Sequence, residues 1–107
     1  MDPDPEILTM ESFAPHAGSV FRVKAGEIEL EFKLEGIKDQ SHLRGEGPDG
    51  KPIGTRDPFT LTLTGPKEVL LAQHMYSVTH PEMGTLILFI KPFHESPDAY
   101  YYEVIFN

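Results

Sequence analysis

The sequence predicts an all-β fold: a small six-stranded antiparallel β-barrel or sandwich with one short N-terminal capping helix. Three observations lead to this prediction. Apolar residues recur at every second position in several short runs, Gly and Pro punctuate the chain between the runs, and heptads are absent. Strands with one apolar face must cover that face, so a set of them either closes on itself or folds into two layers.

The N-terminal part predicts a tether followed by a short helix. Residues 1–8 contain two prolines, which disfavour a helix start, so we expect this segment to be a tether. Thr9 is a suitable N-cap for a helix that runs to about His16. A chain of 107 residues is long enough for one hydrophobic core. We therefore assign residues 9–107 to a single β domain.

The first two strands are predicted at residues 20–24 and 28–36, on either side of a short break. In the second strand the apolar residues share one face and the charged residues share the other: Ile28, Leu30, Phe32 and Leu34 against Glu27, Glu29, Glu31, Lys33 and Glu35. This clean alternation is typical of a strand at the protein surface with its charged face in water.

A long polar connection, residues 38–57, follows the second strand. It contains four glycines and two prolines, and we expect it to offer a contact surface that includes Glu46 and Asp49. Residues 45–51 match the first seven positions of a phosphate-binding P-loop. The eighth position must provide a hydroxyl, and Pro52 has none, so phosphate binding is not predicted. The acidic residues of the connection also lack the spacing of a calcium loop.

The remaining four strands are predicted at residues 59–64, 73–80, 84–93 and 99–107. The run 84–93 is apolar on both faces, so we expect it to sit centrally in the sheet rather than at its edge, with Leu86 to Phe93 as the buried centre. The chain ends inside the last run, so we expect Asn107 to belong to a closing strand. Short turns join every consecutive pair except the second and third, which predicts an antiparallel meander.

Four residues are assigned structural roles: His80, Pro81, Gly84 and Phe106. We expect His80 to pack or hydrogen-bond at the corner before the fifth strand, and His74 to lie on the surface. These two histidines share a strand face but are six residues apart, roughly 20 Å by strand rise, which is too far for one metal ion. No metal ligand, cofactor-binding residue or catalytic residue is assigned.

Composition excludes several classes of function. The net charge is −8 and the nine Lys and Arg residues are scattered singly, so neither nucleic acid nor an anionic membrane is an expected partner. No cysteine is present and no Ser lies in a Gly-x-Ser-x-Gly elbow, so we predict a non-enzymatic domain. No signal peptide or membrane-spanning run is visible, which favours a cytoplasmic protein when synthesised.

The consecutive residues Tyr100, Tyr101 and Tyr102 are candidate protein contacts. Alternation sends Tyr100 and Tyr102 to one face of the last strand and Tyr101 to the other, so one set joins the core and the other lies near water. Tyrosine suits half-wet interfaces because it combines apolar area with a polar tip. Ordinary cross-strand packing is the alternative interpretation.

Five segments carry a family resemblance: Thr9 to Phe13, Pro58 to Leu61, Met75 to Pro81 with Gly84, Leu88 to Pro92, and Tyr102 to Asn107. In this order they resemble a family of small bacterial proteins, the domain of unknown function 6916, over nearly the whole chain. The resemblance implies an all-β single domain without assigned activity. It also implies neighbours of the phage-tail-collar type, and hence an accessory role in a tail-like or fibre assembly that is exported or part of a particle. It transfers no functional residues.

We therefore expect a non-enzymatic interaction or structural accessory module whose partner is another protein, such as one of the tail-collar or fibre type. The expected contact is a sheet edge, the tyrosine face or the 38–57 connection. Two alternatives are a small-ligand-binding β-barrel and an uncharacterised metal-dependent or hydrolytic enzyme. The sequence leaves self-association open.

Overall fold

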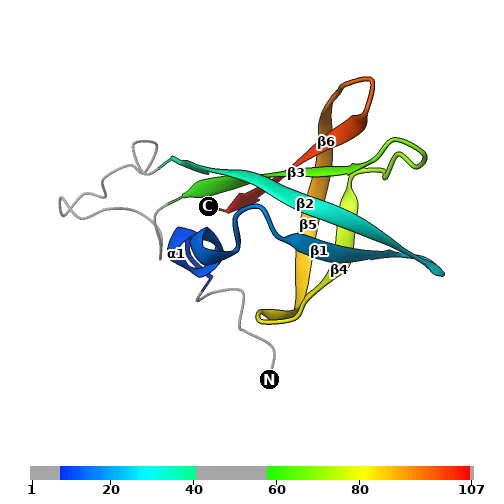
Figure 1. Ribbon diagram of the computed structural model, residues 1–107. Coiled ribbons are helices and arrows are strands. Elements are labelled where there is room, and N and C mark those ends of the chain that lie inside the picture. The colour runs from blue at the N-terminus through cyan, green and yellow to red at the C-terminus, as the bar shows by residue number, and fades with distance from the viewer. Residues whose placement is uncertain (1–7, 41–57, 107) are drawn as a thin grey trace, which may run out of the picture.

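The computed structural model describes residues 8–40 and 58–106, whose strands form one closed barrel (Figure 1). A short helix, α1 (Met10–Phe13), continues into a 3-10 turn, Ala14–His16. No helix in this described part is long and apolar enough to cross a membrane. The strands are β1 (Val20–Ala25), β2 (Ile28–Asp39), β3 (Phe59–Pro66), β4 (His74–His80), β5 (Gly84–Glu95) and β6 (Ala99–Phe106). The predicted all-β fold with a short N-terminal helix is confirmed, and its form is a barrel.

The strand order around the barrel is β1-β2-β3-β6-β5-β4, and all neighbouring strands are antiparallel. The predicted meander is therefore wrong: β3 pairs with β6, and β4 crosses over to pair with β1. Three consecutive strands followed by a fourth beside the first form a Greek key. Residues 67–73 make the crossing. Because a closed barrel has no free edge, the sheet edge expected to bind a partner is absent from the described strands.

The β1–β2 hairpin shows how the sequence determines a local turn. Ala25 pairs with Ile28, so Gly26 and Glu27 are the two turn residues. Gly26 has a φ of 65°, and no non-glycine among the described residues has a positive φ. A single positive φ at the first central position is the pattern of a type II′ turn, whose twist matches that of the flanking strands. The glycine therefore sets the register of the hairpin.

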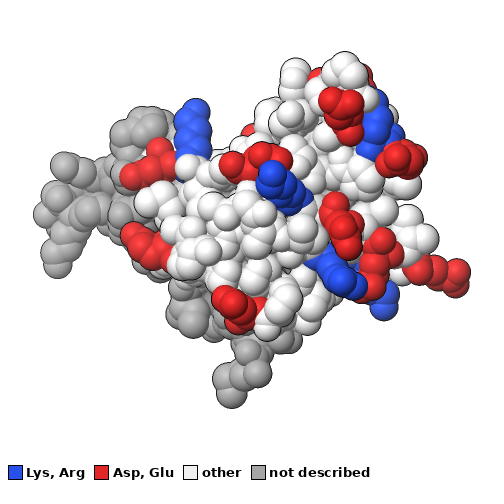
Figure 2. Space-filling view, in the orientation of Figure 1, with Lys and Arg blue, Asp and Glu red and all other residues white. Residues whose placement is uncertain are grey.

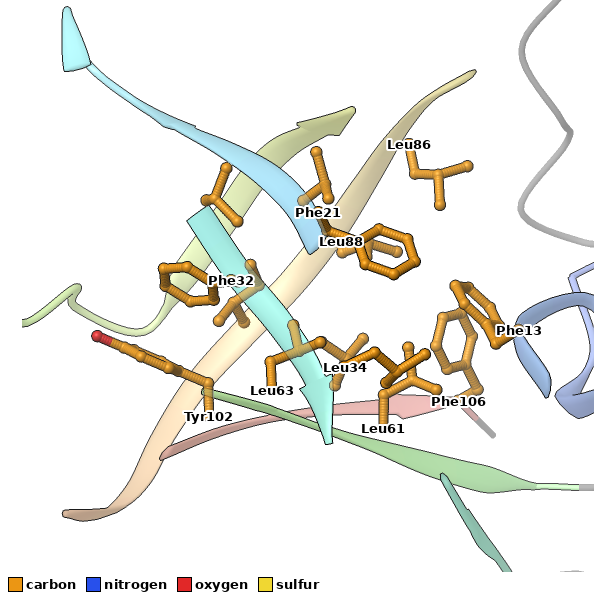
Figure 3. Close-up of a cluster of buried hydrophobic side chains, with 14 of the residues drawn as sticks. Phe13, Phe21, Phe32, Leu34, Leu61, Leu63, Leu86, Leu88, Tyr102 and Phe106 are labelled. Atoms are coloured by element: carbon orange, nitrogen blue, oxygen red, sulfur yellow. The ribbon is translucent and has the colours of Figure 1, made fainter. Parts of the chain in front are cut away.

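Side chains from all six strands, together with Phe13 of α1, fill the barrel interior (Figure 3). The largest of those with no appreciable exposure are Tyr102, Phe13, Phe32, Phe59, Leu34, Leu61, Leu63, Ile90, Val23 and Val78. A barrel of this few strands has an interior only wide enough for its own side chains. The small-ligand alternative therefore cannot rely on a cavity between these residues.

Aromatic side chains close both ends of the barrel. The ring of Phe13 lies 6.0 Å from that of Phe59 and 5.5 Å from that of Phe106, so α1 covers the end at which β6 finishes (Figures 1 and 3). Away from α1, the Tyr102 hydroxyl accepts the backbone N–H of Leu71 at 3.0 Å. This bond fastens the β3–β4 crossing to the barrel. Phe106, assigned a structural role from the sequence, thus lies under the capping helix.

Strand β5 differs from its prediction. Leu86, Leu88 and Ile90 face the interior, whereas Ile87 and Phe89 are exposed. The wall of a barrel covers only one face of each strand, and no second layer of described residues covers the other. The predicted central position is confirmed, because β5 pairs with β4 on one side and with β6 on the other. The prediction that Leu86 to Phe93 form a buried centre is wrong for the outward residues Ile87, Phe89 and Phe93.

Charged side chains of both signs are interspersed on the surface that Figure 2 shows. They gather near the tips of the β1–β2 and β5–β6 hairpins. In the β1–β2 register, Arg22 lies opposite Glu31 and Lys24 lies opposite Glu29. Such cross-strand pairs of opposite charge contribute roughly 0.2–1 kcal/mol each. The acidic face of β2 is exposed as predicted, and bases from β1 partly balance it.

Candidate functional site

The three consecutive tyrosines alternate across β6 as predicted, but Tyr102 is a core residue. Its ring lies 4.7 Å from that of Phe32, and its hydroxyl is bound to the N–H of Leu71. Burial raises the pKa of this hydroxyl above its usual value. The candidate contact at Tyr102 is therefore corrected, because a fully buried side chain offers no surface to a partner.

Tyr100 and Tyr101 are each half-buried near the β5–β6 hairpin. The amino group of Lys67 lies 4.3 Å from the centre of the Tyr100 ring, which is a cation–π contact. The Tyr101 ring lies 5.3 Å from the ring of His94 and 6.5 Å from that of Phe93. Both tyrosines thus keep some accessible surface, unlike Tyr102.

The other two candidate contacts, Glu46 and Asp49, lie outside the described residues. The P-loop-like segment 45–52 lies outside them as well. Of the predicted 38–57 connection, Lys38 and Asp39 belong to the end of β2, which is longer than its prediction.

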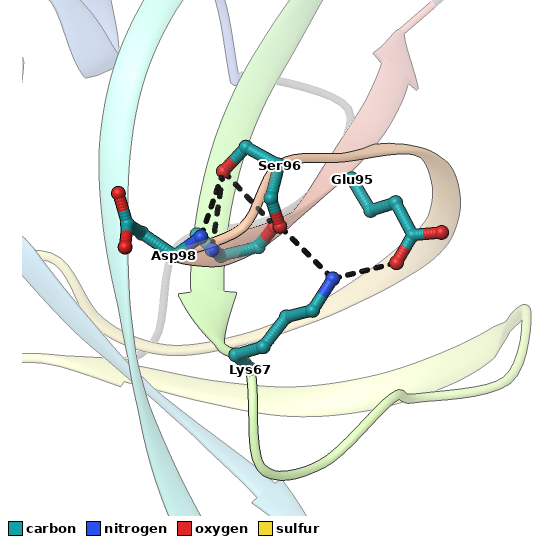
Figure 4. A network of polar contacts seen from close by, with 5 residues as sticks. Lys67, Glu95, Ser96 and Asp98 are labelled. Carbon is teal, nitrogen blue, oxygen red and sulfur yellow. Dashed lines mark hydrogen bonds and ion pairs between the residues drawn. The ribbon is translucent and has the colours of Figure 1, made fainter.

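Lys67 fastens the β3–β4 crossing to the β5–β6 hairpin (Figure 4). Its amino group donates hydrogen bonds to Glu95 Oε2 at 2.6 Å and to the Ser96 carbonyl at 2.9 Å. The Ser96 hydroxyl oxygen accepts the N–H groups of Asp98 and Ala99 and so closes the hairpin turn. The hydrogen bond and positive charge of Lys67 lower the pKa of the Glu95 carboxyl. The hairpin tip is thus tied to a neighbouring segment by side-chain and backbone contacts.

A shallow groove of about 290 Å³ lies beside the hydrogen bonds that Lys67 makes with Glu95 and Ser96. Its lining residues come from the crossing and the hairpin: Leu70, Pro92, Phe93, His94, Glu95 and Tyr100. Leu70 and Phe93 are exposed large apolar residues, and a bulge in β5 between Pro92 and His94 accompanies the outward position of Phe93. Apolar walls with a few polar groups are typical of ligand sites, although this groove is small and open.

His80 is buried at the corner where β4 turns into β5. Its Nδ1 accepts the backbone N–H groups of Glu82 at 3.1 Å and Met83 at 3.3 Å. Because Nδ1 is an acceptor, the proton of the neutral ring is on Nε2, which lies 3.1 Å from Ser19 Oγ. Ser19 Oγ in turn donates to the carbonyl of His16 at 2.6 Å. This series of hydrogen bonds ties the β4–β5 turn to the segment that precedes β1.

The Ser19–His80 pair is not arranged as a nucleophile and its general base. A base must present an unprotonated nitrogen to the hydroxyl that it activates. Here the nitrogen that faces Ser19 carries the proton, and the Ser19 proton points to a carbonyl. Burial, and then the nearby His16, lower the pKa of His80, while Glu82 opposes this effect. The lowered pKa favours the neutral ring, which can accept the two backbone N–H groups at Nδ1.

The histidines of β4 do not come together around a metal site. His74 is exposed and its ring lies 5.9 Å from that of Tyr76, whereas His80 is buried at the opposite end of the strand. Within residues 8–40 and 58–106, no group of three His, Asp or Glu side chains could hold a metal ion.

Four large apolar side chains are exposed on the outer side of β4, β5 and β6, and we call this surface the outer apolar face. They are Met75, Ile87, Phe89 and Ile105, with exposed fractions of 49%, 52%, 45% and 50%. Met75 pairs directly with Phe89 across the β4–β5 ladder, and Ile87 lies two residues before Phe89. Extending the β5–β6 register by two residues brings Ile105 beside Phe89. The four side chains therefore adjoin on three neighbouring strands.

The outer apolar face could not be recognised as long as Leu86 to Phe93 was expected to be a buried centre. A signal was nevertheless present. Ile87 and Phe89 occupy the same alternating positions that carry Glu and Lys on β2. Once β5 is known to form a barrel wall, Ile87 and Phe89 are exposed at positions where β2 carries charged residues.

Comparisons with known proteins place the chain in a family without an assigned function. Residues 8–106 match the model of the family described as Domain of unknown function (DUF6916). Searches of curated proteins and of solved structures each found no match. The matched span includes α1 and all six strands. The chain therefore belongs to the DUF6916 family, as the resemblance of its motifs predicts.

Proposed function

We propose that this domain is a non-enzymatic protein-interaction module that binds its partner through the outer apolar face. The observation that supports the proposal is the adjoining exposure of Met75, Ile87, Phe89 and Ile105. Single exposed apolar residues are common, whereas adjoining ones mark interaction sites. The four half-exposed side chains present an apolar area on the order of 400 Å², comparable with the largest, often functional, patch of a typical monomer.

The position of the face also suits a binding role. It lies on hydrogen-bonded strands whose inner residues are packed in the core, so its side chains are held on a rigid support. A rigid surface loses little conformational entropy on binding. The enzymatic alternative is less favoured, because His80 presents a protonated nitrogen to Ser19 and cannot act as its general base.

Capture experiments with matched variants test this proposal. Immobilised wild-type protein is compared with the double variant Ile87→Ser/Phe89→Ser in extracts of cells that naturally carry the gene. Ile28→Ser is the control, since Ile28 is equally exposed but lies at the β1–β2 hairpin. We expect a protein bound by the wild type and the control to be depleted about tenfold or more with the double variant. Identical capture by all three proteins would rule out the outer apolar face as the binding surface.

A small-ligand role is the second candidate, and the groove beside Lys67 favours it. The ligand would lie against Leu70, Phe93 and Tyr100, outside the filled barrel interior. A fragment screen by NMR should then shift the signals of these three residues, and Phe93→Ala should abolish the shifts. A screen in which no fragment perturbs the groove would remove this candidate.

An accessory role in a phage-tail-like or fibre assembly is a narrower form of the first proposal. It rests on the family resemblance alone. The genes that flank this one test it: tail or fibre genes as neighbours would support it, and their absence across several genomes would count against it.

A further inference from the structure

The charges around the outer apolar face differ from those of the chain as a whole. Lys24 of β1 lies opposite Ser77 of β4, which in turn lies opposite Ile87. Lys91 follows Phe89 by two residues on β5, and so extends the same outward side. Basic side chains therefore border the face on its β1 side and at one end.

This placement is notable because bases are scarce. The chain carries a net charge of −8. The described residues include six Lys and Arg, namely Arg22, Lys24, Lys33, Lys38, Lys67 and Lys91. Three of these six, Arg22, Lys24 and Lys91, lie on β1 or β5 around the face, and Arg22 pairs with Thr79 of β4. The acidic residues of β2 lie one strand further away, beyond β1.

We infer that the outer apolar face recognises an acidic and apolar segment of a partner protein, an inference that rests on the proposed function. Apolar side chains of the segment pack on Met75 and Phe89, and its carboxylates lie near Lys24 and Lys91. The segment is recognised through side chains, because the closed barrel offers no free strand edge for backbone pairing.

Charge complementarity favours this occupant over a second copy of the same chain. In a symmetric dimer the same patch meets itself, so one interface gathers the border bases of both copies, with the Glu103 carboxylate of each copy as the acid at the face. An acidic partner instead places opposite charges together, which speeds association and selects against wrong partners. Glu103 lies 3.9 Å from Lys91 and is itself half-buried. Glu31 and Glu29 lie opposite Arg22 and Lys24, but on the side of β1 away from the face, so on that side the bases are the charges nearer to it.

Two synthetic peptides provide the probe. Both carry the same alternating Leu, Ile and Phe residues; one has Glu between them and the other has Lys. Binding is measured by fluorescence anisotropy at low salt for the wild type, Lys24→Glu/Lys91→Glu, Ile87→Ser/Phe89→Ser and the charge-matched control Lys33→Glu/Lys38→Glu. Circular dichroism confirms that each variant is folded, and sedimentation velocity gives its oligomeric state.

We expect the Glu peptide to bind the wild type and the control alike, and the Lys24→Glu/Lys91→Glu variant about tenfold more weakly, since each exposed ion pair contributes up to roughly 1 kcal/mol. The Lys peptide should bind the wild type more weakly by a similar factor. If both peptides bind equally and only Ile87→Ser/Phe89→Ser abolishes the binding, the inference of an acidic partner is overturned and the proposed function stands. If the wild type is a dimer and Ile87→Ser/Phe89→Ser is a monomer, the inference is overturned and the occupant of the face is a second copy of this chain. Binding of neither peptide overturns it as well, while the capture experiment decides the proposed function separately.

Discussion

A Cβ atom on Gly65 would lie 2.7 Å from Cε1 of Phe32, far closer than packed carbon atoms approach. Gly65 is buried in β3, and the Phe32 ring from β2 occupies the space above it. The Phe32 ring is restricted further because its centre lies 4.7 Å from that of the Tyr102 ring. The core therefore uses the missing side chain at Gly65 to seat two aromatic rings.

Gly65→Ala should accordingly destabilise the protein by about 1–3 kcal/mol, the usual cost of overpacking a core. The added methyl group forces the Phe32 ring to shift within the packed core. Urea unfolding followed by circular dichroism measures the change. Gly36→Ala on β2 is the control, since nothing lies within 4 Å of a Cβ there, and its stability should change by no more than about 0.5 kcal/mol. Equal losses in the two variants would contradict the close-contact explanation.

Tyr102→Phe should cost about 1–3 kcal/mol of unfolding free energy, because it leaves the N–H of Leu71 buried without its acceptor. Tyr76→Phe removes a comparable bond from the same crossing, the one that the Tyr76 hydroxyl donates to the Ala72 carbonyl at 2.6 Å. That carbonyl lies in an exposed position, so water replaces the lost donor and the cost should stay below about 1 kcal/mol. If Tyr76→Phe proves the more damaging of the two, burial is not what makes the Tyr102 bond important.

The individual strands could be predicted from the sequence because their signals are local. Phe59, Leu61 and Leu63 alternate with threonines, and Gly26 supplies the turn of the first hairpin. The strand order could not be predicted in the same way. The pairing of β3 with β6 joins segments far apart in the chain, and no local pattern distinguishes it from the pairing of β3 with β4 that a meander requires.

The candidate site was harder to predict, because exposure depends on the closed barrel. An apolar run with two apolar faces suits a central strand covered on both sides, and it equally suits a barrel wall that binds a partner. Only the closed order of strands shows that Ile87 and Phe89 point outward. At His80 the sequence indicated a buried corner, but the acceptor role of Nδ1 depends on the path of the turn through Glu82 and Met83.

Stability should fall in mild acid because of His80. Its pKa in the folded protein is lowered from 6.5, so the unfolded chain binds the proton more readily. The contribution of His80 is therefore complete above about pH 6.5 and declines as the pH falls below that value towards the lower folded pKa. Protonation of Nδ1 would also remove the acceptor of the backbone N–H groups of Glu82 and Met83. His16, whose ring lies 4.5 Å away, also opposes a positive charge on His80, and Glu82 partly offsets this effect.

Urea unfolding between about pH 5 and pH 8 tests this dependence. His80→Asn retains an acceptor for the turn but cannot take up a proton, so its unfolding free energy should vary less with pH. The variant should also be less stable at neutral pH, because it loses the ring contact with Phe21 at 4.5 Å. His74→Asn, at an exposed position on the same strand, should keep the wild-type pH profile. An unchanged profile in His80→Asn would assign the acid sensitivity to another group.

Lys67→Gln should raise the pKa of the Glu95 carboxyl towards its usual value, because Lys67 supplies the hydrogen bond and most of the positive charge that lower it. The pair is exposed, so global stability should change by less than about 1 kcal/mol. An NMR titration of the Glu95 side chain measures the pKa directly, with Lys91→Gln as the control that keeps the Lys67 contact. Lys67→Gln should also speed hydrogen exchange at the N–H groups of Asp98 and Ala99, because the hairpin turn loses its hydrogen bond to the β3–β4 crossing. A raised pKa without faster exchange would mean that Ser96 holds the turn by itself and that Lys67 contributes only charge.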